Sequence, residues 1–193
     1  YYAKRIRSLL RQGDRKRMLS ALTDMAEGLR QGGAGDADDK KRWQRSMAEA
    51  DLGMRQVATR WHSDGSKTKK SAMLKDAATV YELYMELMTD SSHRHEMLFY
   101  QGELLFGMKR YQDAALAYQG SVQLNRKGQY AADAALEMVR SYDELIAAEE
   151  SKGKAQDKAK VKERSARMMA ACKLYLEIAP EGEMAAVARY RIA

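Results

Sequence analysis

Apolar residues recur at steps of three and four along most of the chain, the spacing that places side chains on one face of a helix. The clearest example covers residues 97–126, where the apolar face consists of Leu98, Gly102, Leu105, Ala114, Ala115, Tyr118 and Val122. The stretch 108–111 in its middle is too short for anything but an antiparallel reversal of the chain. Residues 97–126 are therefore predicted to form a helical hairpin.

The same spacing predicts further helices at 1–12, 14–30, 40–61, 71–88, 129–148, 166–178 and 184–193. Asp14 is the predicted N-cap of the second of them. The Gly-rich acidic stretch 31–39 is predicted to be a loop, and the polar stretch 62–70 a turn. Residues 149–163 are rich in Lys and poor in large apolar side chains, which predicts either a solvated helical extension or a disordered insertion. With one Pro and abundant helix formers, the predicted fold class is all-α.

Part of this pattern repeats along the chain. Residues 83–91 align with 120–128 and with 174–182, at offsets of 37 and 54 residues. The second offset is the first plus 17 residues, an excess that the Lys-rich segment accounts for. A period in the mid-thirties with two helices in each unit indicates an array of helical hairpins that stack on their neighbours.

This pattern resembles the tetratricopeptide repeat family. The residues that match the family's positions are Gly102, Leu105, Ala114, Tyr118 and Pro180. The departures are Leu98 for Trp, Gln101 for Leu, Val139 for a small residue, Cys172 for an aromatic one, and Arg126 and Thr89 for Pro. The resemblance implies tetratricopeptide-like hairpins stacked into a right-handed α-solenoid. It covers residues 71–193, with the insertion at 149–163 and a truncated last hairpin, and implies a degenerate N-terminal part at 1–70.

Several short motifs look like those of the long repeat lipoproteins of deltaproteobacteria, including proteins of the myxobacterial gliding machinery. They are Leu52-Gly53, Trp61-His62, Lys67-Thr68, Tyr84-x-Glu86-Leu87, Gly102-Glu103-Leu104-Leu105, Lys127-Gly128-x-Tyr130 and Ala171-Cys172. The resemblance implies a periplasmic or outer-membrane-associated scaffold held by an anchor outside this chain. Because the chain begins with Tyr1, we expect a mature form or an excised segment. No run of 18 apolar residues predicts a membrane span, and the residues alone leave a cytoplasmic location open.

The family's groove register, carried over to this sequence, implies contacts with a partner protein. The positions are Glu96, Phe99, Glu103 and Phe106, then Asp133, Leu136, Arg140 and Asp143 at a shift of 37, and Val187 and Tyr190 at a shift of 91. Aromatic anchors mixed with both signs of charge suit an extended peptide or a partner helix better than a small metabolite. The predicted function is therefore a non-enzymatic protein interaction scaffold.

The net charge of +7 is unevenly distributed. Residues 1–20 carry +6 and residues 152–167 carry +5, which leaves −4 for the rest of the chain. The second basic run contains Lys152, Lys154, Lys158, Lys160 and Lys162. Charge runs are usually solvated spacers, but segments 1–17 and 152–167 support an alternative function, an adaptor for nucleic acid or an anionic membrane surface. Since the rest of the chain is acidic, a general nucleic-acid-binding surface is not indicated.

The sequence offers no combination of residues that predicts catalysis, a metal or a cofactor. Cys172 is the only cysteine, which excludes an intrachain disulfide and a Cys-rich metal site. His93 and His95 are two positions apart and would point to different faces of a helix. Glu149 and Glu150 are expected in a solvated stretch, away from any pocket that could separate their pKa values.

Overall fold

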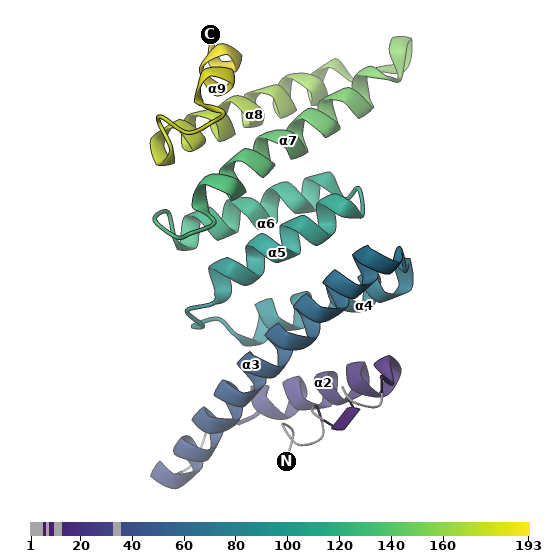
Figure 1. The fold of residues 1–193 in the computed structure, drawn as a ribbon, viewed down its shortest axis with the longest axis vertical. Coiled ribbons are helices and arrows are strands. Elements are labelled where there is room, and N and C mark those ends of the chain that lie inside the picture. Colours follow the sequence, from purple (N-terminus) through teal and green to yellow (C-terminus); the bar gives the residue numbers. More distant parts are fainter. Residues whose placement is uncertain (1–5, 7, 10–12, 33–35) are drawn as a thin grey trace. The chain divides into compact units, whose positions relative to one another are not determined.

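A computed structural model of the chain describes residues 6, 8–9, 13–32 and 36–193. These residues form helices and connecting turns, with no β-strand among them (Figure 1). The prediction of an all-α fold is therefore confirmed. The chain divides into two compact units, Tyr1–Arg94 (unit 1) and His95–Ala193 (unit 2). The helix predicted at 1–12 lies for the most part outside the described residues.

Unit 1 contains three described helices, α2 (Arg15–Arg30), α3 (Ala37–Thr68) and α4 (Ser71–Leu87). Helix α2 begins after the predicted cap, because the Asp14 carboxylate accepts a hydrogen bond from the Arg17 backbone N–H at 3.0 Å. It packs against both α3 and α4. Ion pairs join the N-terminal halves of α2 and α4 through Arg15 and Asp76, and their last turns through Arg30 and Glu86. The two helices therefore run parallel.

Helix α3 is longer at both ends than the sequence pattern predicted. The predicted turn at 62–70 is wrong, because α3 continues to Thr68 and only Lys69 and Lys70 separate it from α4. Gly65 is buried where the two helices meet, and a Cβ atom there would lie 2.7 Å from Leu74 Cδ2. At the other end Asp36 caps the helix through the Asp39 backbone N–H, so the predicted loop 31–39 is shorter than expected.

Unit 2 contains helices α5 (Arg94–Gly107), α6 (Tyr111–Leu124), α7 (Ala131–Glu150), α8 (Lys158–Ile178) and α9 (Ala185–Ile192), and the short 3-10 helix η1 (Gly153–Ala155). The predicted hairpin at 97–126 is confirmed as α5 and α6. Helix α6 packs against α7, α7 against α8 and α8 against α9. The core between them is rich in Ala and contains Tyr118, Tyr142 and Tyr175.

Helices α5 and α6 approach each other closely at Gly102. A Cβ atom at this position would be 2.5 Å from Cε1 of Tyr118, whose ring is fully buried. The pairing of a residue without a side chain and a large ring therefore sets the distance between the two helices. The predicted interior positions Gly102, Ala114 and Tyr118 are all buried.

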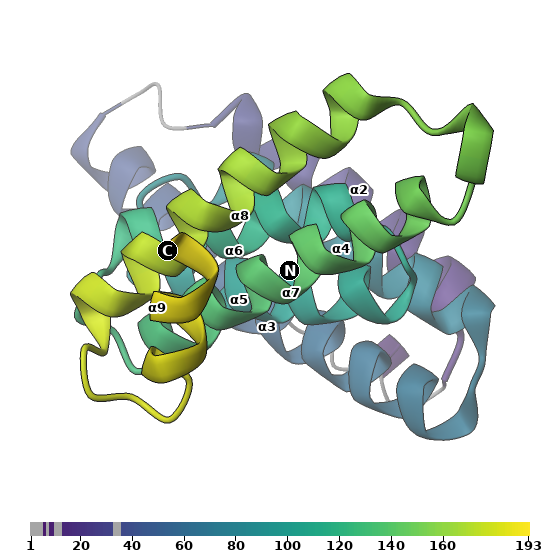
Figure 2. The same ribbon diagram turned by 90° about the horizontal axis from the view of Figure 1, so that it is seen from above.

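The Lys-rich segment forms the helical extension that was one of its two predicted conformations. Helix α7 continues to Glu150 and α8 begins at Lys158, so that their connection extends beyond the other helices of unit 2 (Figures 1 and 2). Glu149, expected to be solvated, is 3% exposed. Its carboxylate accepts hydrogen bonds from Lys152 Nζ at 2.9 Å, the Asp157 backbone N–H at 3.1 Å and Arg164 Nη1 at 3.3 Å. The first two of these lower the pKa of Glu149.

Candidate functional site

Four of the predicted contact residues lie around one cavity of unit 2. Leu136, Arg140 and Asp143 of α7 and Val187 of α9 line a cavity of about 180 Å³, which also reaches Cys172 of α8. Asp143 forms an ion pair with Arg191 of α9 beside it. Val187 is 42% exposed, so the cavity opens between α7 and α9 with an apolar side chain at its edge. Positions that are far apart in the sequence thus meet on one face.

The two predicted aromatic anchors are half-buried because each packs on a tyrosine. Phe99 stacks on Tyr130 with ring centroids 4.6 Å apart and an angle of 13° between the rings. The hydroxyls of Tyr100 and Tyr130 are hydrogen bonded at 2.7 Å, which fixes the second ring of this stack. Phe106 packs edge to face on Tyr111 at 5.1 Å. Both phenylalanines therefore combine a packing role with a partly exposed surface.

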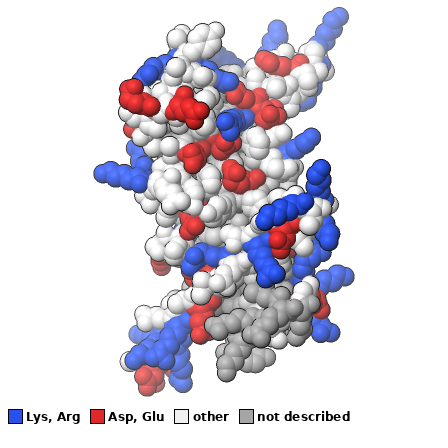
Figure 3. Space-filling view, viewed as in Figure 1, with Lys and Arg blue, Asp and Glu red and all other residues white. Residues whose placement is uncertain are grey.

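Acidic side chains dominate the same face, where they gather over α5 and α7 (Figure 3). Glu103 is exposed and accepts a hydrogen bond from the Tyr118 hydroxyl at 2.7 Å. Glu137 is half-buried and pairs with Arg140 at 2.5 Å. Burial raises the pKa of Glu137, and the nearby charges of Glu103 and Asp133 raise it further against the opposing effect of Arg140. The face therefore carries a negative field that its own arginines only partly offset.

The remaining predicted contact residues do not line the cavity of unit 2. Glu96 is half-buried in the first turn of α5, and Asp133 is exposed in the first turn of α7. Tyr190 of α9 is 83% exposed, which is the highest value among the large hydrophobic side chains of the described residues. A contact of any of the predicted residues with a partner stays a prediction.

The predicted basic patch lies on the α7–α8 connection. Lys152 pairs with Glu149, and Lys160 pairs with Asp157. Lys154, Lys158 and Lys162 are exposed and form no ion pair within the described part of the chain. Residues 1–12 of the other basic segment lie mostly outside the described residues.

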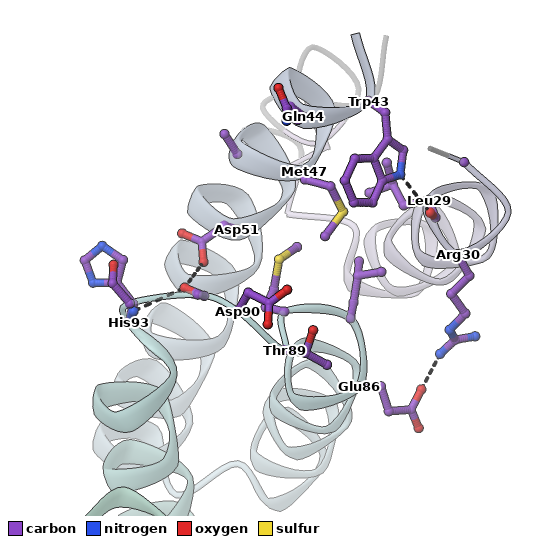
Figure 4. A pocket seen from close by; sticks show the side chains of 16 residues that line it. Leu29, Arg30, Trp43, Gln44, Met47, Asp51, Glu86, Thr89, Asp90 and His93 are labelled. Carbon is purple, nitrogen blue, oxygen red and sulfur yellow. Dashed lines mark hydrogen bonds and ion pairs between the residues drawn. The ribbon is translucent and has the colours of Figure 1, made fainter. Parts of the chain in front are cut away.

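A cleft in unit 1 was not predicted from the sequence. It has a volume of about 670 Å³ and lies between the C-terminal end of α2, the N-terminal half of α3 and the turn after α4 (Figure 4). Trp43 and Met47 of α3 form part of its wall, and both are half-buried. Their spacing of four residues is that of a continuous apolar helix face, and helical periodicity does not show where the neighbouring helix stops.

The single thiol is buried in the core, and His95 takes part in the packing of α5 on α6 through its backbone. Cys172 is buried, and burial raises the pKa of its thiol. The His95 carbonyl accepts a hydrogen bond from the Ser121 hydroxyl at 2.7 Å. Among the described residues, no group of three or more His, Cys, Asp or Glu side chains is arranged to hold a metal ion.

No model of a known protein family matches the sequence, and no curated protein matches it. None of the helices in the described ranges is long and apolar enough to cross a membrane.

Proposed function

We propose that the chain is a non-enzymatic protein interaction scaffold, built from tetratricopeptide-like hairpins that stack into a right-handed α-solenoid. The observation that carries this proposal is the α5–α7–α9 face of unit 2, where an apolar cavity adjoins an acidic surface. Four side chains that the repeat register selected, Leu136, Arg140, Asp143 and Val187, line that cavity. Such a face suits a peptide or a partner helix, since apolar pockets supply affinity and charges around them fix orientation.

The charges of the face indicate the chemistry of the partner. Arg140 and Arg191 are each paired with a carboxylate of the same face, Glu137 and Asp143 respectively. Glu103 and Asp133 are exposed and form no ion pair within the described residues. The raised pKa of Glu137 reflects its burial and these negative neighbours. The favoured partner therefore presents basic residues, which steer its association and set its orientation.

Substitution of the two half-buried phenylalanines, Phe99 and Phe106, tests whether this face binds the partner. The double variant Phe99→Ala and Phe106→Ala is expected to lose capture of the partner protein while its far-ultraviolet circular dichroism is retained. The matched control is Leu116→Ala with Leu124→Ala, because these α6 side chains are 51% and 54% exposed and lie outside the face. Capture by this control should be unchanged. Capture retained by the phenylalanine variant would refute the proposal, and a loss of its helicity would assign both rings to the core.

The location at the cell envelope, including an association with gliding machinery, is part of the proposal and rests on the resemblance of the short motifs. Fractionation of cells that express the full-length protein tests it. The alternative adaptor function has one supporting observation, the three exposed lysines without ion pairs, Lys154, Lys158 and Lys162. Binding through them would weaken steeply between low and moderate salt and would be lost when all three lysines are changed to Glu, whereas capture through the face of unit 2 would survive that change.

A further inference from the structure

The cleft of unit 1 exists because two packed helices differ in length. Helix α3 has 32 residues and α4 has 17. At a rise of about 1.5 Å per residue, about 22 Å of the N-terminal half of α3 extends past the end of α4. The last turn of α2 and the turn at 88–93 surround this extension without covering it (Figure 4). All of the lining residues belong to unit 1.

The walls of the cleft are apolar and adaptable. Its apolar lining residues are Leu29, Trp43, Met47, Ala48, Leu87 and Met88. The indole N–H of Trp43 donates to the Leu29 carbonyl at 3.0 Å, so the ring is held in place with its remaining surface available. Methionine side chains adjust to ligands of different shape. A volume of about 670 Å³ is typical of ligand pockets and exceeds that of one large side chain.

The rim of the cleft is negative. Asp51, Glu86 and Asp90 line it together with a single arginine, Arg30, which pairs with Glu86. Asp90 is exposed and has no ion pair in the part of the chain that the structure describes. The C-terminal ends of α2 and α4 also line the cleft, and each adds the partial negative charge of a helix terminus. Because Asp51 and Glu86 are paired with Arg55 and Arg30, it is Asp90 and the two helix ends that favour a cationic group.

A hydrogen-bonded network fixes the wall that carries this charge. The Asp51 carboxylate accepts hydrogen bonds from the Tyr84 hydroxyl at 2.7 Å, from the Ser91 hydroxyl at 2.6 Å and from Arg55 Nε at 2.9 Å. Burial alone would raise the pKa of Asp51, but these bonds outweigh it and lower the pKa. The carboxylate stays ionised and connects α3 to the turn after α4. The cleft is thus formed before a ligand arrives, which reduces the entropic cost of binding.

We propose that this cleft is a second binding site, which takes a peptide segment with a large apolar side chain next to Lys or Arg. The apolar side chain enters between Trp43 and Met47, and the cation lies at the rim near Asp90. This site is separate from the α5–α7–α9 face and does not depend on the function proposed for that face.

Three synthetic peptides test the chemistry of the site by calorimetry on the whole 193-residue chain. One alternates Lys and Leu, one alternates Glu and Leu, and one alternates Lys and Ser. The first is expected to bind at least about tenfold more tightly than either of the others, because it alone supplies both the cation and the apolar group. Equal affinities for all three peptides would overturn the proposal.

Variants of the cleft locate the binding. Met47→Lys places a cation in the cleft, and Thr89→Trp fills it from the opposite, exposed wall. Each is expected to weaken binding of the Lys–Leu peptide about tenfold or more. The control is Glu27→Lys, which adds positive charge to an exposed position of α2 outside the cleft and should leave affinity within about twofold.

Two outcomes would contradict the assignment to the cleft. One is an equal loss of affinity in the Glu27→Lys control, which would indicate non-specific attraction to negative charge. The other is binding that survives Met47→Lys and Thr89→Trp but is lost in Phe106→Ala, which would place the peptide on the α5–α7–α9 face instead. A loss of peptide affinity confined to the cleft variants would support this site, whether or not the function proposed for the face of unit 2 is correct.

Discussion

The α3–α4 hairpin of unit 1 and the α5–α6 hairpin of unit 2 are related by a shift of 37 residues, and each has a buried glycine in its first helix and a buried tyrosine in its second. Gly65 and Gly102 occupy equivalent positions, and at both a Cβ atom would collide with the second helix of the hairpin. Tyr81 and Tyr118 are also equivalent, and both are fully buried. An aromatic ring of the first helix contacts each tyrosine, with centroids about 6 Å apart in both hairpins.

The two hairpins differ in helix length and in the identity of that aromatic ring. The first helix has 32 residues in unit 1 and 14 in unit 2. His62 stands in unit 1 where Phe99 stands in unit 2. The buried glycines also meet different residues of the second helix, Leu74 at Gly65 and Tyr118 at Gly102. Extra length on one helix creates a cleft, whereas neighbouring hairpins in unit 2 create a face.

The largest effect is expected from truncation of the two equivalent tyrosines. Tyr81→Ala and Tyr118→Ala should each lower the free energy of unfolding by about 3–5 kcal/mol, because each removes a fully buried ring. The control Tyr118→Phe keeps the ring and loses the hydrogen bond to Glu103, so it should cost only about 1 kcal/mol. Chemical denaturation measures all three. An unchanged free energy of unfolding for either alanine variant would show that the two tyrosines do not play the same part in their hairpins.

A smaller effect is expected where the helices approach most closely. Gly102→Ala places Cβ 2.5 Å from a buried ring and should cost about 1–3 kcal/mol. Gly65→Ala should cost less, because the atom met at 2.7 Å ends the flexible Leu74 side chain. Gly107→Ala is the control, since nothing lies within 4 Å of its Cβ, and it should stabilise α5 by up to about 1 kcal/mol. Equal changes in the free energy of unfolding at all three positions would show that close helix packing is not the reason why glycine stands at Gly102 and Gly65.

The smallest effect is expected from His62, which titrates, whereas its counterpart Phe99 in unit 2 does not. Burial lowers the pKa of His62, so the folded protein favours the neutral ring. Below the unfolded pKa of about 6.5 the unfolded chain takes up a proton more readily, and stability falls as the pH drops toward the folded pKa. His62→Phe removes this loss. Denaturation at pH 8 and pH 5 should show a larger advantage of the variant at pH 5, and an equal difference at both would contradict the assignment.

The sequence predicted the fold class and most helices because periodic apolar positions report which face of a helix is buried. It predicted the hairpin at 97–126, the Asp14 cap and the buried positions Gly102 and Tyr118 correctly. It failed at 62–70, where polar residues suggested a turn although they lie on the solvated side of α3 around the buried Gly65. The alignment at a shift of 37 places Gly65 opposite Gly102 and contains the signal that this stretch is helical.

The candidate sites were harder to predict, because they depend on contacts between distant residues. Glu149 reads as part of a charged run, but its burial depends on Lys152, Asp157 and Arg164, which fold back onto it. The cleft beside Trp43 depends on where α4 ends relative to α3, and no local pattern contains that information. The repeat register did select Leu136 and Val187, which line one cavity.

Site-specific photo-crosslinking in cells tests the central proposal most directly. A photoreactive phenylalanine analogue at position 106 reports on the α5–α7–α9 face, and the same analogue at position 116 reports on an exposed α6 position outside it. The scaffold proposal predicts a discrete crosslinked protein from Phe106, its loss in the Leu136→Lys background, which places a cation in the cavity that receives a basic partner, and none from Leu116. Crosslinks of equal yield from both positions, or from Leu116 alone, would contradict it.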